Sequence, residues 1–273
     1  MLRYVNSLDD PQLACYRAMK DKELARTGDR FIAEGEQIVR RLLASSLRVE
    51  SILVARRKES LIASLVPSDV SMYVADDEVI ERLIGFKFHS GVLACGIRPG
   101  ALSLEEMLGR PGESQGNRPT IVVCPKITNT DNLGAMIRLC AGFGVTGMLL
   151  GEQCCDPFFR HSVRVSMGSV FVLPMIRSGD YRSDLKRLRD EWGFELAATV
   201  ISPDAQPLAK AVRGNRLALL FGSEADGLDA ADIAFCDRRI CIPMRRGTDS
   251  INVAIAAGIF LHHFIDECEV GHR

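Results

Sequence analysis

Three polar segments in the second half of the sequence each follow a short apolar run. The first spans residues 125–138 and contains Asn132 and Arg138. The second, residues 222–228, reads Gly-Ser-Glu-Ala-Asp-Gly-Leu and centres on Glu224, and the third, residues 243–254, contains Ser250 and Asn252. Amide, guanidinium, carboxylate and hydroxyl groups together supply hydrogen-bond donors, acceptors and both signs of charge. Such a set can orient a polar substrate and stabilise charge that develops during a reaction.

The backbone of these segments also suits ligand binding. Gly222 and Gly227 let the chain turn sharply and approach a ligand closely, and the start of a helix predicted at Ser250 offers free N–H groups. Asn132 and Arg138 lie on opposite sides of a helix if both are helical, so they converge only if Asn132 precedes the helix. The ordinary alternatives are a capping Asn132 with a surface Arg138, a plain turn at 222–228 and a capped, buried C-terminal helix.

The elements that must position these segments alternate along residues 120–273. Apolar runs predict strands at 121–123, 147–150, 170–175, 195–200, 217–221 and 239–242. Helical spacing covers 132–142, 181–192 and 250–268. Continuous apolar strands alternating with helices indicate an open, mostly parallel α/β sheet covered on both faces. Ligands bind at the carboxyl edge of such sheets, which is where the three polar segments fall.

Residues 1–100 predict a smaller, separate α/β domain. Strands are expected at 31–33, 51–54, 72–74 and 92–97, and helices at 10–26, 37–43 and 78–84. Residues 101–119 are rich in Gly, Pro and polar side chains and predict a linker. The expected organisation is therefore an N-terminal domain at 1–100, a linker at 101–119 and a second domain at 120–273.

Composition is that of an ordinary globular protein. The 273 residues are 47% hydrophobic and 25% charged, with a net charge of −1 that does not itself point to nucleic acid. No apolar stretch is long enough to span a membrane and the N-terminus lacks a signal-peptide core, so a cytoplasmic protein without a membrane partner is expected. Nine scattered cysteines without a C-x-x-C pair predict buried, reduced thiols, and no metal-ligand spacing appears.

Two segments partly match known catalytic or cofactor-binding motifs but lack a required feature. Residues 142–147, Gly-Phe-Gly-Val-Thr-Gly, fit the dinucleotide fingerprint, yet the expected helix precedes them and the expected strand follows, which is the reverse of the required order. Ser223 directly follows Gly222, so the segment is not a hydrolase nucleophile elbow. A nicotinamide or flavin dehydrogenase and a serine hydrolase are both disfavoured.

Taken in order, the three polar segments resemble the motifs of the SpoU-type RNA methyltransferases of the SPOUT superfamily. The matching runs are Asn-Leu-Gly-Ala-Met-Ile-Arg at 132–138, Gly-Ser-Glu-Ala-Asp-Gly-Leu at 222–228, Ile-Pro-Met at 242–244 and Ser-Ile-Asn-Val-Ala at 250–254. Residues 164–169, leading to 173–174, are similar to the family's connecting segment. The chain departs from the family at Thr130-Asp131, Ala225 and Ile251, without altering the polar positions.

The resemblance implies a deep C-terminal trefoil knot that binds S-adenosylmethionine, and a homodimer formed through the C-terminal domain with its two sites near the interface. It implies 2′-O-methylation of a ribose in a structured RNA, with ribosomal RNA preferred over transfer RNA, and requires no metal. The implied catalytic residues are Asn132, Arg138, Glu224, Ser250 and Asn252. The implied cofactor contacts are Thr199, Gly222, Ile242, Met244 and Ile251.

The first domain resembles the family's N-terminal substrate-binding domain, which has a ribosomal-protein-like α/β fold. The resemblance rests on Phe-Ile-Ala-Glu-Gly-Glu at 31–36 and Gly-Val-Leu-Ala at 91–94. It gives the local basic residues a purpose as phosphate contacts to RNA: Arg40, Arg41, Arg56, Arg57, Lys58 and Arg164. The remaining alternative is a non-catalytic RNA-binding or ribosome-assembly protein that retains the fold.

Overall fold

The structure is a computed structural model that describes residues 2–5, 7, 9–17, 28–85, 87–112 and 118–265. It divides the chain into two compact units. The first comprises Met1–Gly100 together with Asp156–Val172, and the second comprises Ala101–Cys155 together with Leu173–Arg273. The polar segments that carry the candidate chemistry all belong to the second unit.

The second unit is built on a parallel sheet with the strand order β10-β12-β9-β11-β6-β7-β8. Its strands are β6 (Thr120–Cys124), β7 (Gly147–Leu150), β8 (Met175–Arg177), β9 (Glu195–Thr199), β10 (Gln206–Pro207), β11 (Leu217–Leu220) and β12 (Arg238–Cys241). The central strands β6, β7 and β11 are buried along their whole length, as continuous apolar runs require. The predicted parallel α/β sheet is confirmed.

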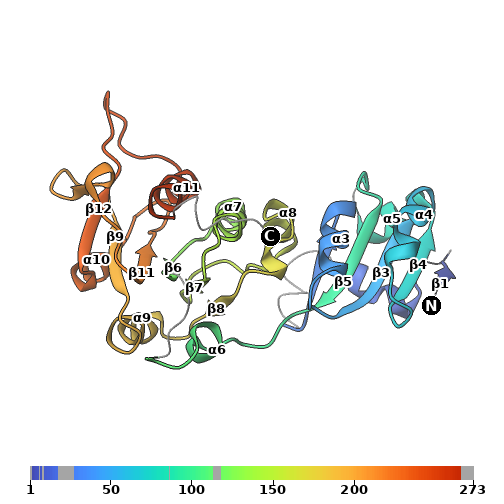
Figure 1. Cartoon of the computed structure of the whole chain (residues 1–273). Helices are drawn as coiled ribbons and strands as arrows, with labels where there is room; N and C mark the ends of the chain where they lie inside the picture. The colour runs from blue at the N-terminus through green and yellow to red at the C-terminus, as the bar shows by residue number, and fades with distance from the viewer. Residues whose placement is uncertain are drawn as a thin grey trace. The chain divides into compact units, whose positions relative to one another are not determined.

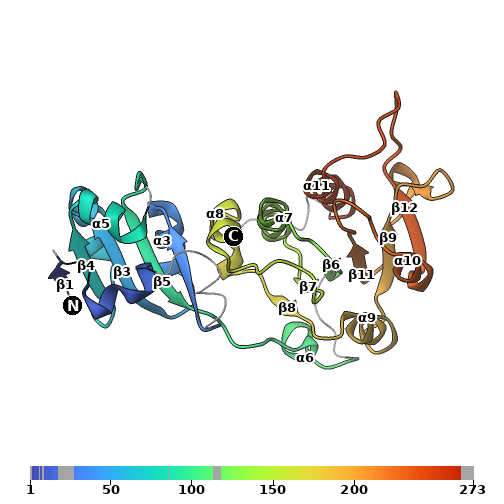
Figure 2. The ribbon, with the colours of Figure 1, turned by 180° about the vertical axis from the view of Figure 1, so that it is seen from behind.

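Helices cover both faces of this sheet (Figure 1). On one face, α6 (Leu104–Leu108) and α9 (Tyr181–Asp190) share a buried core with β6, β9 and β11, and α10 (Ala230–Phe235) packs against that core through Ile233. On the other, α7 (Thr130–Gly142) and α11 (Val253–Phe264) lie side by side in both views (Figures 1 and 2). Phe260 of α11 contacts Phe221, which directly follows β11, with ring centroids 5.7 Å apart.

The predicted linker at 101–119 is wrong for residues 104–108. Residues 104–108 form α6, whose Ser103 side chain accepts a hydrogen bond from the Glu106 N–H in a reciprocal capping box. Leu104 and Leu108 are buried in the core of the second unit. The Gly- and Pro-rich composition of this region did not indicate the short helix, which is stabilised by packing. Residues 113–117 lie outside the described part of the chain.

The predicted strand at 170–175 is also wrong. Residues Ser169–Phe171 form a 3₁₀ turn that follows Gly168, whose φ is 81°, and β8 begins only at Met175. Pro174 has no N–H to give to a strand ladder, although its carbonyl accepts a hydrogen bond of 2.9 Å from the Met148 N–H. Val170 and Phe171 are apolar because they are buried in the first unit.

The first unit contains a mixed sheet with the order β1-β4-β3-β5-β2. Its strands are β1 (Leu2–Tyr4), β2 (Arg30–Glu34), β3 (Val49–Ala55), β4 (Ser71–Ala75) and β5 (Val92–Ile97), and its helices are α1 (Ala14–Arg17), α3 (Glu36–Leu43), α4 (Glu59–Ile62), α5 (Asp77–Ile84) and α8 (Arg160–Val165). The helix predicted at 10–26 begins with a 3₁₀ turn, Pro11–Leu13, and α1, and residues 18–27 lie outside the described part. Gly96 faces Phe31 across the β2–β5 pair, where a Cβ would overlap the ring.

Residues 156–172, which separate β7 from β8 in sequence, pack on the first unit and include α8. Arg98 forms an ion pair with Asp156 at 2.7 Å, and Arg160 forms one with Glu34 at 3.0 Å. The Phe31 ring lies 5.0 Å from that of Phe158 and 5.6 Å from that of Phe171. The predicted domain boundary at residue 100 therefore needs a correction, because the first unit also contains residues 156–172.

Candidate functional site

Three predicted site residues from three distant segments form one hydrogen-bonded network. The Asn132 Nδ2 donates to Glu224 Oε1 at 2.9 Å, and the Asn252 Nδ2 donates to Asn132 Oδ1 at 2.8 Å. Asn132 is only 8% exposed, so its amide is held in one orientation by both partners. The side chains of Glu224 and Asn252 reach it from the loop after β11 and from the start of α11. We call these three residues the Asn–Glu–Asn network.

Asn132 and Asn252 lie at other positions relative to their helices than the sequence predicts. Asn132 lies inside the first turn of α7, and the residue that caps this helix is Asn129, whose Oδ1 accepts from the N–H groups of Asp131 and Asn132. At the other helix, α11 begins at Val253 rather than at Ser250, and Asn252 is its cap. Asn252 therefore has two structural duties, since its Oδ1 fixes α11 while its Nδ2 holds Asn132.

The loop that carries Glu224 is closed tightly on itself. Ser223 and Gly227 exchange backbone hydrogen bonds of 2.9 and 3.1 Å, and the Ser223 hydroxyl accepts from the Asp226 N–H. A Cβ on Gly222 would overlap the backbone of Gly227 and Leu228. Glycine at 222 is thus required for the closed loop, and the loop is what aims Glu224 at Asn132.

Substituting Gly222 tests this requirement. Gly222→Ala is expected to open the loop, lower the melting temperature and abolish measurable binding of S-adenosylmethionine, the cofactor that the family resemblance implies, because a backbone overlap cannot be relieved by a side-chain movement. Gly142→Ala is the matched control, since a Cβ there meets nothing within 4 Å and alanine favours the helix end. Calorimetric titration and thermal denaturation measure both effects; equal behaviour of the two variants would contradict the assignment.

The predicted cofactor contacts lie along the carboxyl edge of adjacent strands. Thr199 ends β9, Gly222 follows β11 and Ile242 follows β12, and these three strands are neighbours in the sheet. All three residues are partly exposed. The Thr199 hydroxyl donates to the Leu220 carbonyl at 2.8 Å, so it fastens two strand ends together. The edge leaves backbone groups at Gly222 and Ile242 for a ligand.

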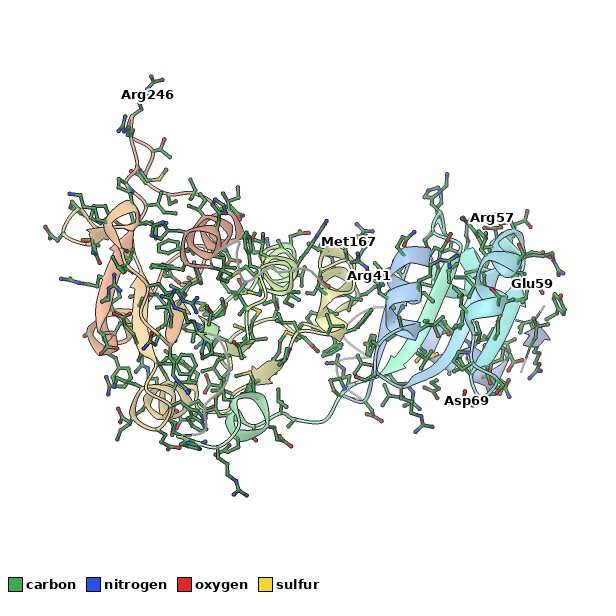
Figure 3. All side chains as sticks on the ribbon, viewed as in Figure 1. Arg41, Arg57, Glu59, Asp69, Met167 and Arg246 are labelled. Atoms are coloured by element: carbon green, nitrogen blue, oxygen red, sulfur yellow. The ribbon has the colours of Figure 1, made fainter. Side chains whose placement is uncertain are left out.

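The loop between β12 and α11 carries the remaining predicted residues. Met244 and Ile251 are partly exposed and Ser250 is exposed. The loop projects from the unit with Arg246 near its tip (Figure 3), where Arg246 and Gly247 both have positive φ, 58° and 71°. Ser250 is joined to the Asn–Glu–Asn network by no interaction found among the described residues.

Arg138 does not join the network within one chain. It is exposed on α7, six residues beyond Asn132 and therefore roughly 120° around the helix from it. Because Asn132 is helical, the condition under which the two side chains would converge is not met. Of the five predicted catalytic residues, the fold brings together Asn132, Glu224 and Asn252, and leaves Arg138 and Ser250 on exposed positions.

Two supporting residues were not predicted. The Lys126 Nζ lies 3.3 Å from an Asp226 carboxylate oxygen, which ties the segment before α7 to the loop that carries Glu224. The second is Asn129: the sequence predicts Asn132 as the helix cap, whereas Asn129 caps α7 in the structure. A single sequence gives two asparagines three positions apart, and only the observed helix start distinguishes them.

Two cysteines near this edge of the sheet, Cys124 and Cys154, are buried thiols. Burial holds the pKa of the Cys124 thiol well above its ordinary value, and burial likewise raises the pKa of the Cys154 thiol. Both stay protonated at neutral pH and are not thiolate nucleophiles. No cluster of three or more His, Cys, Asp or Glu side chains suited to a metal ion is found in the described ranges.

The basic residues predicted to contact RNA are mostly paired with carboxylates of the first unit. Arg56 and Arg57 form ion pairs with Asp76 and Asp77, at 2.8 and 2.9 Å. Arg40 and Lys58 both pair with Glu36, at 3.1 and 3.0 Å.

The last two of these basic residues belong to the side of the first unit formed with residues 156–172. Arg41 donates to the Met167 carbonyl, and these residues lie close together in Figure 3. Arg164 is exposed on α8 and lines a pocket of the first unit. Only Arg164 among the six is neither ion-paired nor hydrogen-bonded to a group of the described residues.

Comparison with known proteins extends over the whole chain. Residues 119–262 match the profile of the SpoU rRNA Methylase family. An uncharacterized tRNA/rRNA methyltransferase of Mycobacterium tuberculosis is 35% identical over 97% of this chain and 91% of its own length. The 23S rRNA (guanosine(2553)-2′-O)-methyltransferase RlmP of Bacillus subtilis is 24% identical over 96% of this chain and 99% of its own.

Solved structures share the fold. The AdoMet-bound rRNA methyltransferase from Sinorhizobium meliloti superimposes with a TM-score of 0.81 at 24% identity, covering 96% of this chain and 97% of that one. The SpoU methyltransferase AviRb from Streptomyces viridochromogenes, in complex with AdoMet, gives a TM-score of 0.77 at 22% identity, covering 96% and 100%. In the described part of this chain, no helix is both long and apolar enough to cross a membrane.

Proposed function

Since this chain belongs to the SpoU rRNA methylase family, we propose that it transfers a methyl group from S-adenosylmethionine to the 2′-hydroxyl of a ribose in RNA. The observation that carries the proposal is the Asn–Glu–Asn network, which joins the three family motifs at the carboxyl edge of the sheet. The ribose specificity is supported by the name of the Bacillus subtilis relative, which is aligned over nearly its whole length.

The residues at this edge fit the cofactor. The tight turn at Gly222 and the backbone after β12 place backbone hydrogen-bonding groups at the ends of β11 and β12, which flank β9 in the sheet. We assign the cofactor contacts to Gly222, Ile242 and Ile251, with Thr199 and Met244 beside them. When bound, S-adenosylmethionine supplies a methyl group on a positively charged sulfur that leaves readily, so the chain needs no metal for this reaction.

The side chains of the site then have separate roles. A neutral hydroxyl is a weak nucleophile and must be oriented. As its oxygen bonds to the methyl group, the carbon–sulfur bond breaks, the neutral thioether leaves and the hydroxyl proton passes to water. We assign to Arg138 the binding of the RNA phosphate beside the reacting ribose, because a guanidinium grips phosphate through two hydrogen bonds and does not lose its proton. Glu224 and Asn252, held by Asn132, keep the three segments in register, and Ser250 lies two residues before Asn252, within reach of an incoming substrate.

A homodimer formed through the second unit is part of the proposal. Ile255 and Ile259 lie four residues apart on α11 and are 58% and 41% exposed, which leaves an apolar strip beside α7. A second copy that covers this strip would also bring its own exposed Arg138 toward the interface. Sedimentation equilibrium measures the association state, and a monomer at micromolar concentration would contradict the proposed homodimer.

The deep trefoil knot and cytoplasmic action complete the proposal. Support for the knot comes from the parallel sheet and from the packing of α11 on α7 after the chain has left β12. Ribosomal RNA is the preferred substrate, as for RlmP of Bacillus subtilis. A non-catalytic RNA-binding protein would share the fold, so turnover has to be measured directly.

The decisive experiment maps 2′-O-methyl groups in total cellular RNA with and without this protein. One or a few riboses are expected to lose the modification in its absence and to regain it when purified protein and S-adenosylmethionine are added. Transfer RNA and ribosomal RNA are read in the same experiment. An unchanged map, together with no methyl incorporation from labelled cofactor, would refute the enzymatic function.

A further inference from the structure

A pocket of about 560 Å³ lies within the first unit, where three stretches of chain meet. One stretch is the end of β2 with the start of α3, the second is the loop before β5, and the third is α8 with Met167, two residues beyond its end. The lining residues are Glu34, Gly35, Glu36, Gln37, Ile38, Lys87, His89, Ser90, Arg160, Arg164 and Met167. None of them takes part in the Asn–Glu–Asn network.

The unneutralised charge of this pocket is positive. Glu34 is paired with Arg160, and Glu36 is shared between Lys58 and Arg40. These two cations hold the pKa of the Glu36 carboxyl below its ordinary value. Lys87 and Arg164 are exposed and form no ion pair with another described residue. Two cations therefore remain for a ligand after the internal pairs are formed.

Backbone and hydroxyl groups add hydrogen-bond donors to these cations. Helix α3, eight residues long, begins at the pocket after Gly35, and no side chain caps it. Its first N–H groups and the positive end of its dipole thus face the ligand space. The Ser90 hydroxyl is buried and has no hydrogen-bond partner among the residues that the structure describes. A buried hydroxyl without a partner is costly, and a bound acceptor would satisfy it.

We propose that this pocket binds one nucleotide of the RNA substrate, with a backbone phosphate at the start of α3 between Lys87 and Arg164. This inference rests on the proposed methyltransferase function, and it identifies a site at which the RNA substrate binds. A volume of about 560 Å³ exceeds what a lone phosphate fills and is in the range of pockets for nucleotide-sized ligands. Ile38 and Met167 supply apolar contacts for the sugar or base.

The pocket also includes residues that lie outside the predicted RNA-binding domain at 1–100, among them Arg164, which the sequence already predicted as an RNA contact. Arg160, Arg164 and Met167 come from residues 156–172, inside the stretch that matches the methylase family profile. The predicted RNA-binding domain at 1–100 lacks these three residues. RNA recognition then depends on residues 156–172. These residues lie in sequence between β7 and β8 of the second unit but belong to the first unit.

A pair of double variants tests the pocket. Lys87→Ala with Arg164→Ala removes the two unpaired cations, whereas Arg48→Ala with Arg82→Ala removes the same charge from exposed positions of the first unit outside the pocket. Binding is measured with purified total bacterial ribosomal RNA on filters over a series of salt concentrations. The pocket variant is expected to bind roughly tenfold more weakly and to reduce the salt slope by about 1 to 2.

The control variant is expected to bind nearly as the unmodified protein does, and calorimetric binding of S-adenosylmethionine should be unchanged in both. Equal losses in the two double variants would overturn the pocket. The proposed function fails separately: an unmodified protein that binds RNA but never methylates it loses the enzymatic assignment, while the comparison of variants still tests the pocket.

Ser90→Ala separates a ligand contact from a structural role. Removing a buried hydroxyl that has no partner in the described part of the chain should leave the melting temperature unchanged or raise it. Affinity for the same ribosomal RNA is expected to fall about fivefold, the effect of losing one hydrogen bond. Unaltered affinity in this variant, with the protein folded, would remove the hydroxyl from the pocket's function and contradict the proposed geometry.

Discussion

Replacing Arg138 with alanine is expected to lower the rate of methyl transfer by roughly 10²-fold, the usual effect of misplacing a reacting group, because the reacting ribose is no longer held through its phosphate. Arg138 is exposed on α7 and is bonded to no other described residue, so its loss removes no contact that stabilises the fold. The melting temperature and the affinity for S-adenosylmethionine should therefore stay close to those of the unmodified protein. Radiolabelled methyl incorporation into ribosomal RNA, thermal denaturation and calorimetry provide the three readouts.

Two further variants define what Arg138 does. Arg138→Lys keeps the charge but loses the paired donors of the guanidinium, so it should recover only a small part of the rate. Lys186→Ala removes one exposed cation from α9, on the opposite face of the sheet, and should leave the rate unchanged. Near-normal turnover by the folded Arg138→Ala variant would exclude this residue from the mechanism.

The second large effect is expected from Asn132→Asp. Asn132 now donates to Glu224 and accepts from Asn252, and an aspartate would instead place a second carboxylate against Glu224. Two carboxylates at hydrogen-bond distance repel, and neither can donate when both are ionised. We expect the free energy of unfolding to fall by about 1–3 kcal/mol, and the affinity for S-adenosylmethionine to fall with it.

Adding Glu224→Gln to Asn132→Asp is expected to restore most of the stability. The glutamine amide can donate to the new aspartate, so the hydrogen bond is rebuilt with its direction reversed, while Asn252 keeps its own bond. Glu224→Gln alone should be nearly as stable as the unmodified protein, because its amide oxygen still accepts from Asn132. Thermal denaturation of all four proteins gives the coupling between the two positions.

The pH dependence provides an independent check on the same variants. In the Asn132→Asp protein the close carboxylates raise the pKa of one of them above its unfolded value. The loss of stability is therefore full at pH 8 and relieved as the pH falls through that raised pKa, where one carboxyl is protonated and can donate. A double variant no more stable than Asn132→Asp, or a defect independent of pH, would show that the two side chains are not coupled.

The sequence by itself determined the parallel sheet of the second unit and the segments at its carboxyl edge. The runs at 121–123 and 217–221 are apolar without alternation, and this pattern depends only on each strand being buried on both faces. Gly222 could be selected in the same way, because a glycine directly after a buried strand marks a turn that needs close backbone approach. Asn132, Glu224 and Asn252 follow from the resemblance of their three segments to the family motifs.

Only the tertiary structure decided which of these side chains meet and which basic residues remain available. Asn129 rather than Asn132 caps α7, which turns Arg138 away from the network. Arg56 and Arg57 are neutralised by Asp76 and Asp77, twenty residues further along the chain. The physical reason is that burial leaves a periodic trace within a few residues, whereas the partner of a polar side chain is set by contacts between distant segments, such as the packing of residues 156–172 on the first unit.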